Sequence, residues 1–147
     1  KSESYVLEIE KLHPHITVKQ EACPMWVPLV EDNTFSTSGG EFFIKQNLES
    51  ILSKDPQIDT LVLGCTHYPI LIEQIRKYVP DSVNIIAQGE IVADKLVDYL
   101  KRHIEMADKC SKNGMTNYYT TDNPRSFEEK ASLFLVEEIV AEQIQLS

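Results

Sequence analysis

A short apolar run that leads into a turn constrains this chain more than any other sequence feature. Residues 61–63 are Leu-Val-Leu, Gly64 follows them, and Pro69 lies five residues further on. Short continuous apolar runs of this kind are typical of parallel strands covered on both faces. The pattern therefore predicts a buried strand at residues 59–64, a turn, and then a helix at residues 69–79.

Helix and strand patterns alternate along the rest of the chain. Such alternation predicts an α/β fold with a mostly parallel sheet flanked by helices. Four short strands make a thin sheet for 147 residues, so the sequence could hold parts of two sheets. We expect helices at residues 3–12, 41–53, 90–104 and 124–143, strands at 16–21, 83–86 and 117–121, and loops at 23–40 and 107–116.

Two of the expected helices carry clear apolar faces. Helix 41–53 has Phe42, Phe43, Leu48, Ile51 and Leu52 on its apolar side, and helix 90–104 is expected to turn Ile91, Val92, Leu96, Val97 and Leu100 inward. Before the last helix, Asn123 and Pro124 look like an N-cap followed by a proline in the first turn.

The charge and the cysteine content exclude several classes of function. The chain has 23 acidic and 14 basic residues, a net charge of −9, and no run of like charges. This balance argues against a nucleic-acid partner and against an anionic membrane surface, and no apolar stretch approaches the ~20 residues of a membrane helix. Three cysteines without a C-x-x-C pair indicate free thiols in a reducing cytoplasm.

Cys65 lies at the exit of the predicted strand, where open α/β sheets bind ligands. Amides at a helix start can hold a carboxylate and can lower the pKa of a nearby thiol, and His67 adds a proton carrier two residues on. A cysteine on a strand can equally be a small buried apolar residue. A zinc site and a protease-like Cys–His couple have less support, because neither has partners at a recognisable spacing.

The residues around Cys65 closely resemble a motif of a known family. Residues 61–69 (LVLGCTHYP) resemble the second active-site motif of glutamate racemases, cofactor-independent enzymes that make D-glutamate for peptidoglycan. Residues 21–31 (EACPMWVPLVE) resemble the family's A-C-P-x-x-V-P-L-V-E segment, and residues 118–124 (YYTTDNP) are similar to its C-terminal strand-turn-helix. The resemblance covers nearly the whole chain.

The resemblance implies roles for four residues. Glutamate racemases have two similar α/β domains with the active site between them and an opposed pair of cysteines. Cys65 would be the second of these, the thiolate that takes the proton from L-glutamate. Thr66 and His67 would bind the substrate, His67 would also assist the cysteine, and Glu31 would interact with the substrate ammonium or with His67. No cofactor and no metal are implied.

The sequence also departs from the family. The family's Cys-Asn-Thr motif, which holds the first cysteine, and its early Asp-Ser-Gly motif are absent. We expect Cys23 to be a buried packing residue, and we assign no role to Cys110. The chain thus resembles a C-terminal half, in which residues 1–87 form most of the second domain and residues 88–147 complete the first. The expected partners are glutamate and the missing N-terminal half.

Several alternatives follow from this departure. Without the missing half, the apolar faces of helices 90–104 and 126–140 would be exposed and could promote self-association into a homo-oligomer. A related enzyme such as an aspartate racemase is one alternative function. A non-catalytic fragment that binds a carboxylate or a partner is another.

Overall fold

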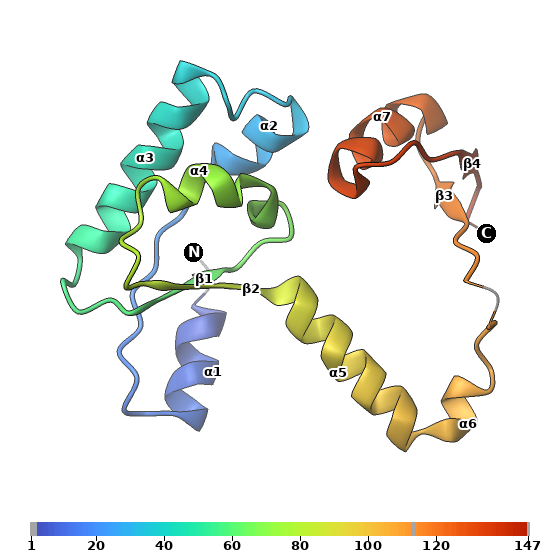
Figure 1. Cartoon of the computed structure of the whole chain (residues 1–147), viewed down its shortest axis with the longest axis horizontal. Helices are drawn as coiled ribbons and strands as arrows, with labels where there is room; N and C mark the ends of the chain where they lie inside the picture. The colour runs from blue at the N-terminus through green and yellow to red at the C-terminus, as the bar shows by residue number, and fades with distance from the viewer. Residues whose placement is uncertain (1–2, 113, 147) are drawn as a thin grey trace. The chain divides into compact units, whose positions relative to one another are not determined.

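A computed structural model describes residues 3–112 and 114–146, so Lys1, Ser2, Asn113 and Ser147 lie outside the described residues. Asn113 belongs to the loop expected at residues 107–116. The contacts divide the chain into two units, the first ending at Gln88 and the second beginning at Gly89 (Figure 1). Both contain helices and parallel strands, so the α/β class is confirmed. The described strands form two small sheets, as the small number of expected strands suggested.

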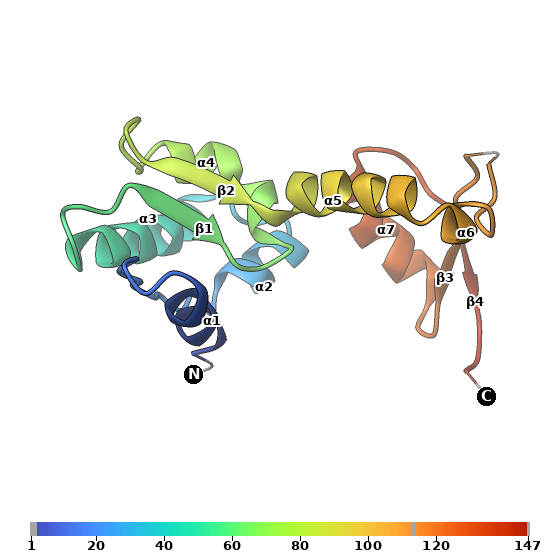
Figure 2. The same ribbon diagram turned by 90° about the horizontal axis from the view of Figure 1, so that it is seen from below.

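The first unit contains a two-stranded parallel sheet covered by helices. In order it comprises α1 (Ser4–Leu12), α2 (Trp26–Glu31), α3 (Ser38–Ser53), β1 (Thr60–Leu63), the 3₁₀ helix η1 (Tyr68–Leu71), α4 (Ile72–Arg76) and β2 (Asn84–Ala87). β1 pairs with β2, and Leu61 lies opposite Ile85. In Figure 1, α2, α3 and α4 lie on one side of these strands and α1 lies on the other, and Figure 2 shows the two strands side by side.

The core of this unit lies where α2, α3, η1 and α4 meet. Its most buried side chains are Val30, Ile44, Leu48, Leu71 and Ile75. Full burial of each such side chain stabilises the fold by roughly 1.5–3 kcal/mol. This packing holds the helices above the sheet and fixes the turn between β1 and η1.

Helix α3 begins three residues earlier than the sequence pattern predicts. The Thr37 hydroxyl accepts a hydrogen bond from the Gly40 amide at 3.1 Å, which caps the helix at Ser38. A Cβ at Gly40 would lie 2.4 Å from the Thr34 carbonyl oxygen, so this close approach requires glycine. The predicted apolar face is partly wrong, because Phe42 is 58% exposed and Ile44 is buried in its place.

Two predictions for residues 16–40 are wrong. The expected loop at 23–40 contains α2, which tolerates Pro28 because a proline in the first helical turn gives up no needed amide. The expected strand at residues 16–21 is not formed, since no strand pairs with these residues in the described parts of the chain. A strand needs a neighbour for its ladder, and a local pattern does not supply one.

The strands at 59–64 and 83–86 are confirmed in position, but β1 is not covered on both faces. Leu63 is buried, whereas the side chain of Val62 is 46% exposed. The predicted helix at 69–79 is divided into η1 and the five-residue α4, with Pro69 in the first turn of η1.

The helix α5 (Gln88–Arg102) starts at the last residue of the first unit and otherwise belongs to the second. The second unit also contains α6 (Ile104–Ala107), β3 (Tyr118–Thr120), α7 (Pro124–Leu135) and β4 (Ala141–Gln143). β3 pairs with β4 in parallel. The Asn123 cap is confirmed, because its side chain accepts hydrogen bonds from the amides of Arg125 and Ser126. The extension of the last helix to residue 143 is wrong, since Val136 adopts a left-handed φ of 57° and ends α7.

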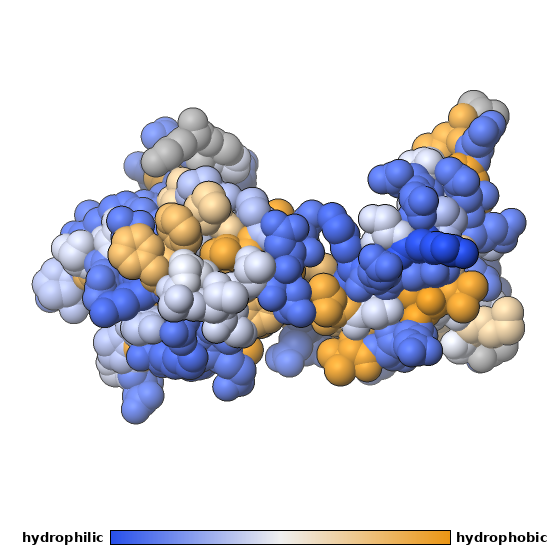
Figure 3. Space-filling view, turned by 90° about the horizontal axis from the view of Figure 1, so that it is seen from above, coloured by the Kyte–Doolittle hydropathy of each residue, from blue (hydrophilic) through white to orange (hydrophobic). Residues whose placement is uncertain are grey.

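Helix α5 exposes the apolar residues that were expected to face inward. Figure 3 shows apolar side chains interrupting the polar surface of the second unit. Within the described residues, nothing covers this face of α5. The predicted inward orientation is therefore wrong for this chain, and the expectation that the face is exposed without the missing half agrees with the structure. The exposed side chains are Ile91, Val92, Leu96 and Val97, between 49% and 62% exposed, while Leu100 is half-buried. None of the described helices is long and apolar enough to cross a membrane.

Candidate functional site

The turn after β1 carries Cys65, the candidate proton-transferring thiol. Cys65 lies two residues beyond the end of β1 and is half-buried, and its carbonyl accepts a hydrogen bond from the Tyr68 amide at 3.2 Å. Gly64 lies under the ring of Tyr5, where a Cβ would come within 3.4 Å of the ring. The strand end, the turn and the start of η1 therefore set the position of the thiol.

Cys65, His67 and Glu31 form a continuous chain of polar contacts. The Cys65 sulfur lies 3.8 Å from His67 Nδ1, and His67 Nε2 lies 3.2 Å from Glu31 Oε1. Glu31 comes from the end of α2, 36 residues before His67. A carboxylate at Nε2 favours the tautomer with its proton on Nε2, which leaves Nδ1 able to accept the thiol proton. The arrangement can thus move a proton onto or off the sulfur. Thr66, which lies between Cys65 and His67 in the sequence, is exposed.

Tyr68 connects this turn to the segment before α2. Its hydroxyl donates a hydrogen bond to the Cys23 carbonyl at 3.4 Å, and its ring packs edge-to-face on Trp26 at 4.8 Å. Burial raises the pKa of Tyr68 to about 12, and the thiols of Cys23 and Cys65 add to the increase, so the hydroxyl stays a donor. No role for Tyr68 follows from the sequence, although Tyr68 and Cys23 each lie in one of the two motifs.

The other two cysteines differ from Cys65. Burial raises the pKa of Cys23 to about 11, with a further contribution from the Glu21 carboxylate, so Cys23 stays a neutral thiol near pH 7. Cys110 is exposed in the second unit, and its thiol donates to the Met106 carbonyl at 3.4 Å. Of the three thiols, the structure pairs Cys65 with an imidazole.

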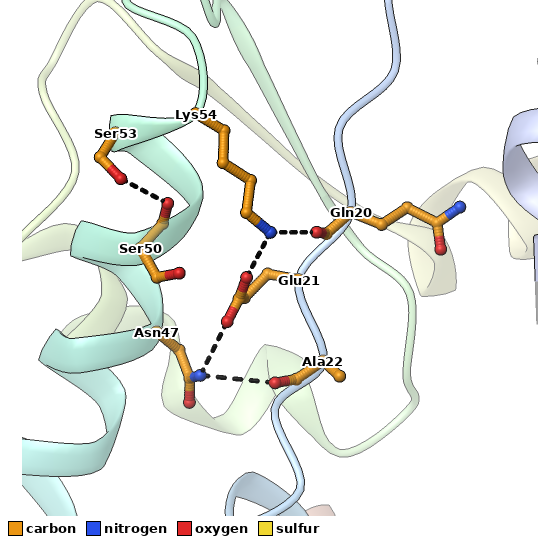
Figure 4. Close-up of polar contacts among 7 residues, drawn as sticks. All are labelled: Gln20, Glu21, Ala22, Asn47, Ser50, Ser53 and Lys54. Carbon is orange, nitrogen blue, oxygen red and sulfur yellow. Dashed lines mark hydrogen bonds and ion pairs between the residues drawn. The ribbon is translucent and has the colours of Figure 1, made fainter. Parts of the chain in front are cut away.

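A polar anchor holds the extended segment that leads to Cys23. The Lys54 ammonium lies 2.5 Å from Glu21 Oε2 and also donates to the Gln20 carbonyl (Figure 4). The Asn47 amide donates to Glu21 Oε1 and to the Ala22 carbonyl, each at 3.4 Å. The hydrogen bond from Lys54 is the main cause that lowers the pKa of Glu21. No local sequence signal marks this pair, because 33 residues separate its members.

The described residues contain no group of three or more His, Cys, Asp or Glu side chains arranged to hold a metal ion. A small hollow of about 350 Å³ lies in the second unit along β3 and α7. It is lined by residues that include Thr120, Asp122 and Phe134.

The fold and the site define an α/β protein in which a cysteine, a histidine and a glutamate are in contact at the end of a parallel strand. The chain is 36% identical over 148 residues to the glutamate racemase of Streptococcus agalactiae serotype Ia and 37% identical to that of Streptococcus pyogenes serotype M49. In both cases the match covers 99% of this chain and 54% of the relative. The chain is a homologue of the glutamate racemases and corresponds to their C-terminal half.

Solved structures agree with this assignment. A glutamate racemase isoform from Bacillus anthracis superposes with a TM-score of 0.81 at 29% identity, covering 97% of this chain and 52% of that one. The Francisella tularensis glutamate racemase, solved in complex with D-glutamate, gives 0.81 at 30% identity and covers 96% and 52%. No family model matches the chain. The chain spans about half the length of the curated relatives it matches.

Proposed function

We propose that this chain supplies one of the two acid–base faces of a glutamate racemase, with Cys65 as its proton carrier. The contact chain of Cys65, His67 and Glu31, within a fold shared with glutamate racemases, is the observation that supports this function. The D-glutamate bound in the F. tularensis structure supports glutamate as the substrate. The relatives favour glutamate over aspartate as the amino acid.

The proposed reaction begins at the sulfur of Cys65. His67 Nδ1 takes the thiol proton, and Glu31 stabilises the resulting imidazolium through Nε2. The thiolate then removes the Cα proton of L-glutamate, and the electron pair stays on the substrate as a carbanion delocalised into its carboxylate. Thr66 lies next to the sulfur in sequence, and we assign it to hydrogen bonding with that carboxylate. Such donors are required because the Cα proton is very weakly acidic.

Inversion requires a second acid on the opposite face of the carbanion. A single thiol would return the proton to the face from which it came, which gives exchange without inversion. Cys23 has too high a pKa and Cys110 has no imidazole partner in the described chain. The second thiol therefore belongs to the half of the racemase fold outside this sequence, and the chain alone does not racemise glutamate.

The domain assignment follows the same reasoning. Residues 1–87 would form most of the domain that carries Cys65, and residues 88–147 would complete the domain that carries the second thiol. The whole enzyme would supply D-glutamate for peptidoglycan in the cytoplasm, without a cofactor.

The test combines this chain with the other half of a relative. The unmatched N-terminal portion of the S. agalactiae racemase is fused to residues 1–147, and inversion of L-glutamate in heavy water is followed by circular dichroism and proton NMR. We expect inversion by the fusion, none by the 147-residue chain alone, and none by the fusion with Cys65→Ala. Cys110→Ala is the matched control and should retain activity. Inversion by the chain alone, or by the Cys65→Ala fusion, would refute the proposal.

A further inference from the structure

The contact between Glu31 and His67 joins two short helices. Glu31 is the last of the six residues of α2, and His67 directly precedes the four-residue η1. Helices this short are not stable by themselves, so their placement depends on the contacts that they make with each other and with the core. The residues that connect α2 with η1 therefore determine whether the carboxylate reaches the imidazole.

The apolar core provides part of this placement. Val30 of α2 and Leu71 of η1 are fully buried, so both helices are anchored in the interior, whereas the side chains of Glu31 and His67 are partly exposed. Apolar burial is non-directional, but a hydrogen bond has a preferred angle as well as a preferred distance. A directional contact between the two helices thus constrains the approach of Glu31 to His67 more tightly than burial alone.

Tyr68, the first residue of η1, makes directional contacts with both segments. Its amide donates to the Cys65 carbonyl at 3.2 Å, and its hydroxyl donates to the Cys23 carbonyl at 3.4 Å. The Cys23 carbonyl also accepts a hydrogen bond from the Trp26 amide at 3.2 Å, in the turn that leads into α2. One residue therefore ties the turn that carries the thiol to the turn from which α2 begins.

The ring of Tyr68 adds a second contact with α2. It meets the indole of Trp26 edge-to-face, with 4.8 Å between the ring centroids and 64° between the ring planes. Aromatic pairs of this kind have a preferred geometry in addition to the area that they bury. Trp26 is buried, and its Nε1 has no hydrogen-bond partner among the described residues, so Trp26 takes part through its ring and not through its N–H group.

We propose that Tyr68 is a positioning residue that holds α2 against η1 at the distance at which Glu31 hydrogen-bonds to His67. It acts through His67 and not on the substrate. A shift of α2 by about 1 Å would lengthen the 3.2 Å contact between Nε2 and Oε1 beyond hydrogen-bond range, and Nδ1 would lose its fixed direction toward the Cys65 sulfur. This inference deepens the proposed function and rests on it, because the orientation of the imidazole affects racemisation only if Cys65 exchanges a proton with His67.

NMR of the 147-residue chain tests the positioning without any catalysis. At pH 8, two-bond proton–nitrogen correlation spectra report which imidazole nitrogen carries the proton, and His67→Asn assigns the His67 signals. We expect the tautomer with its proton on Nε2, protected from exchange by Glu31. In Tyr68→Phe, which keeps the ring on Trp26 and loses the hydroxyl, that proton should exchange roughly 2- to 12-fold faster, the range that corresponds to one neutral hydrogen bond.

Two further variants control this measurement. Trp26→Leu removes the ring contact and keeps the Tyr68 hydroxyl, so it should also speed the exchange, and the test does not depend on the folding of one variant. Tyr78→Phe is the matched control, because Tyr78 is also half-buried in the first unit and its ring contacts Lys45, outside the candidate site. An unchanged exchange rate in Tyr68→Phe or in Trp26→Leu, or an equal increase in Tyr78→Phe, would overturn the inference.

A double-mutant cycle in the fused enzyme separates positioning from general support of the fold. We expect Tyr68→Phe to lower kcat at least about fivefold, and at most by the ~10²-fold that a misplacement of about 1 Å can cost, with KM unchanged. In the His67→Asn background the same substitution should lower kcat less than about twofold, because no imidazole is left to position. Equal losses in the two backgrounds, or no loss in either, would contradict a role through His67.

The two experiments also distinguish this inference from the proposed function. If Tyr68→Phe and Trp26→Leu speed the exchange while the fused enzyme never racemises glutamate, the proposed function is wrong and Tyr68 still positions the imidazole. If the fused enzyme racemises glutamate and neither the exchange nor kcat responds to Tyr68→Phe, the positioning role is wrong and the proposed function stands.

Discussion

The pKa of Cys23 gives a quantitative test of which thiol can act as a base. Burial, with the nearby Glu21 carboxylate, raises this pKa to about 11. At pH 8 an ordinary cysteine with a pKa of about 8.5 is roughly one-quarter thiolate, whereas a pKa of about 11 leaves only about 0.1%. The thiolate of Cys23 in the folded chain is more basic and therefore roughly tenfold more nucleophilic, which partly offsets its low population. The net expectation is that Cys23 reacts with a disulfide about 10- to 20-fold more slowly in the folded chain than in the unfolded chain.

The assay is reaction of the three thiols with an aryl disulfide, resolved by peptide mass spectrometry. The native chain and the chain unfolded in guanidinium chloride are compared between pH 6 and pH 11. We expect the Cys23 rate in the native chain to be lower at pH 8 and still to be rising at pH 10, whereas the unfolded chain levels off near pH 9. A native Cys23 rate that levels off at the same pH as in the unfolded chain would refute the assignment of Cys23 as a neutral packing residue. The same shift implies a loss of folding stability as the pH rises from about 8.5 to about 11, because the folded state holds the thiol proton more tightly.

The remaining predictions concern the site, the anchor and the core. In the fused enzyme, His67→Asn should lower the rate at least ~10²-fold, mainly in the direction that uses Cys65, while equal loss in both directions would show a binding role. Lys54→Met should lower the free energy of unfolding by about 1 kcal/mol at pH 7 and by less below pH 4, because the lowered pKa of Glu21 contributes stability only while Glu21 is charged. Urea titrations at the two pH values measure this difference, with Lys45→Met as the control. Gly40→Ala should destabilise the first unit by roughly 2 kcal/mol or more in the same titration, since its Cβ would collide with the Thr34 carbonyl, and an unchanged midpoint would contradict the close approach.

Local signals predicted the elements that depend on local contacts. The strand at β1, the Asn123 cap and the helix α1 follow from apolar spacing and capping chemistry, and all are found. The strand expected at residues 16–21 failed because its ladder partner is not adjacent in the described chain. The end of α7 at Leu135 was missed because Val136, a β-branched residue, adopts a left-handed conformation that usually marks glycine.

The candidate site divides in the same way. Cys65 and His67 are two residues apart, so their proximity follows from the sequence, and their roles stay predictions. Glu31 was placed near them only through the family resemblance, since 36 residues separate it from His67. The anchor of Lys54 and Glu21 was not foreseen, because a helix and an extended segment meet there through tertiary packing.

The uncovered apolar face of α5 has a consequence for how solutions of this chain behave. Copies that each carry a net charge of −9 repel one another, and at low ionic strength this repulsion acts over tens of ångströms. Added salt shortens that range to about 8 Å at 0.15 M and about 3 Å at 1 M, while sulfate strengthens apolar attraction. At high salt the apolar attraction between the exposed faces of α5 outweighs the charge repulsion between copies. We therefore expect the chain to stay dispersed at low ionic strength and to aggregate at high ionic strength.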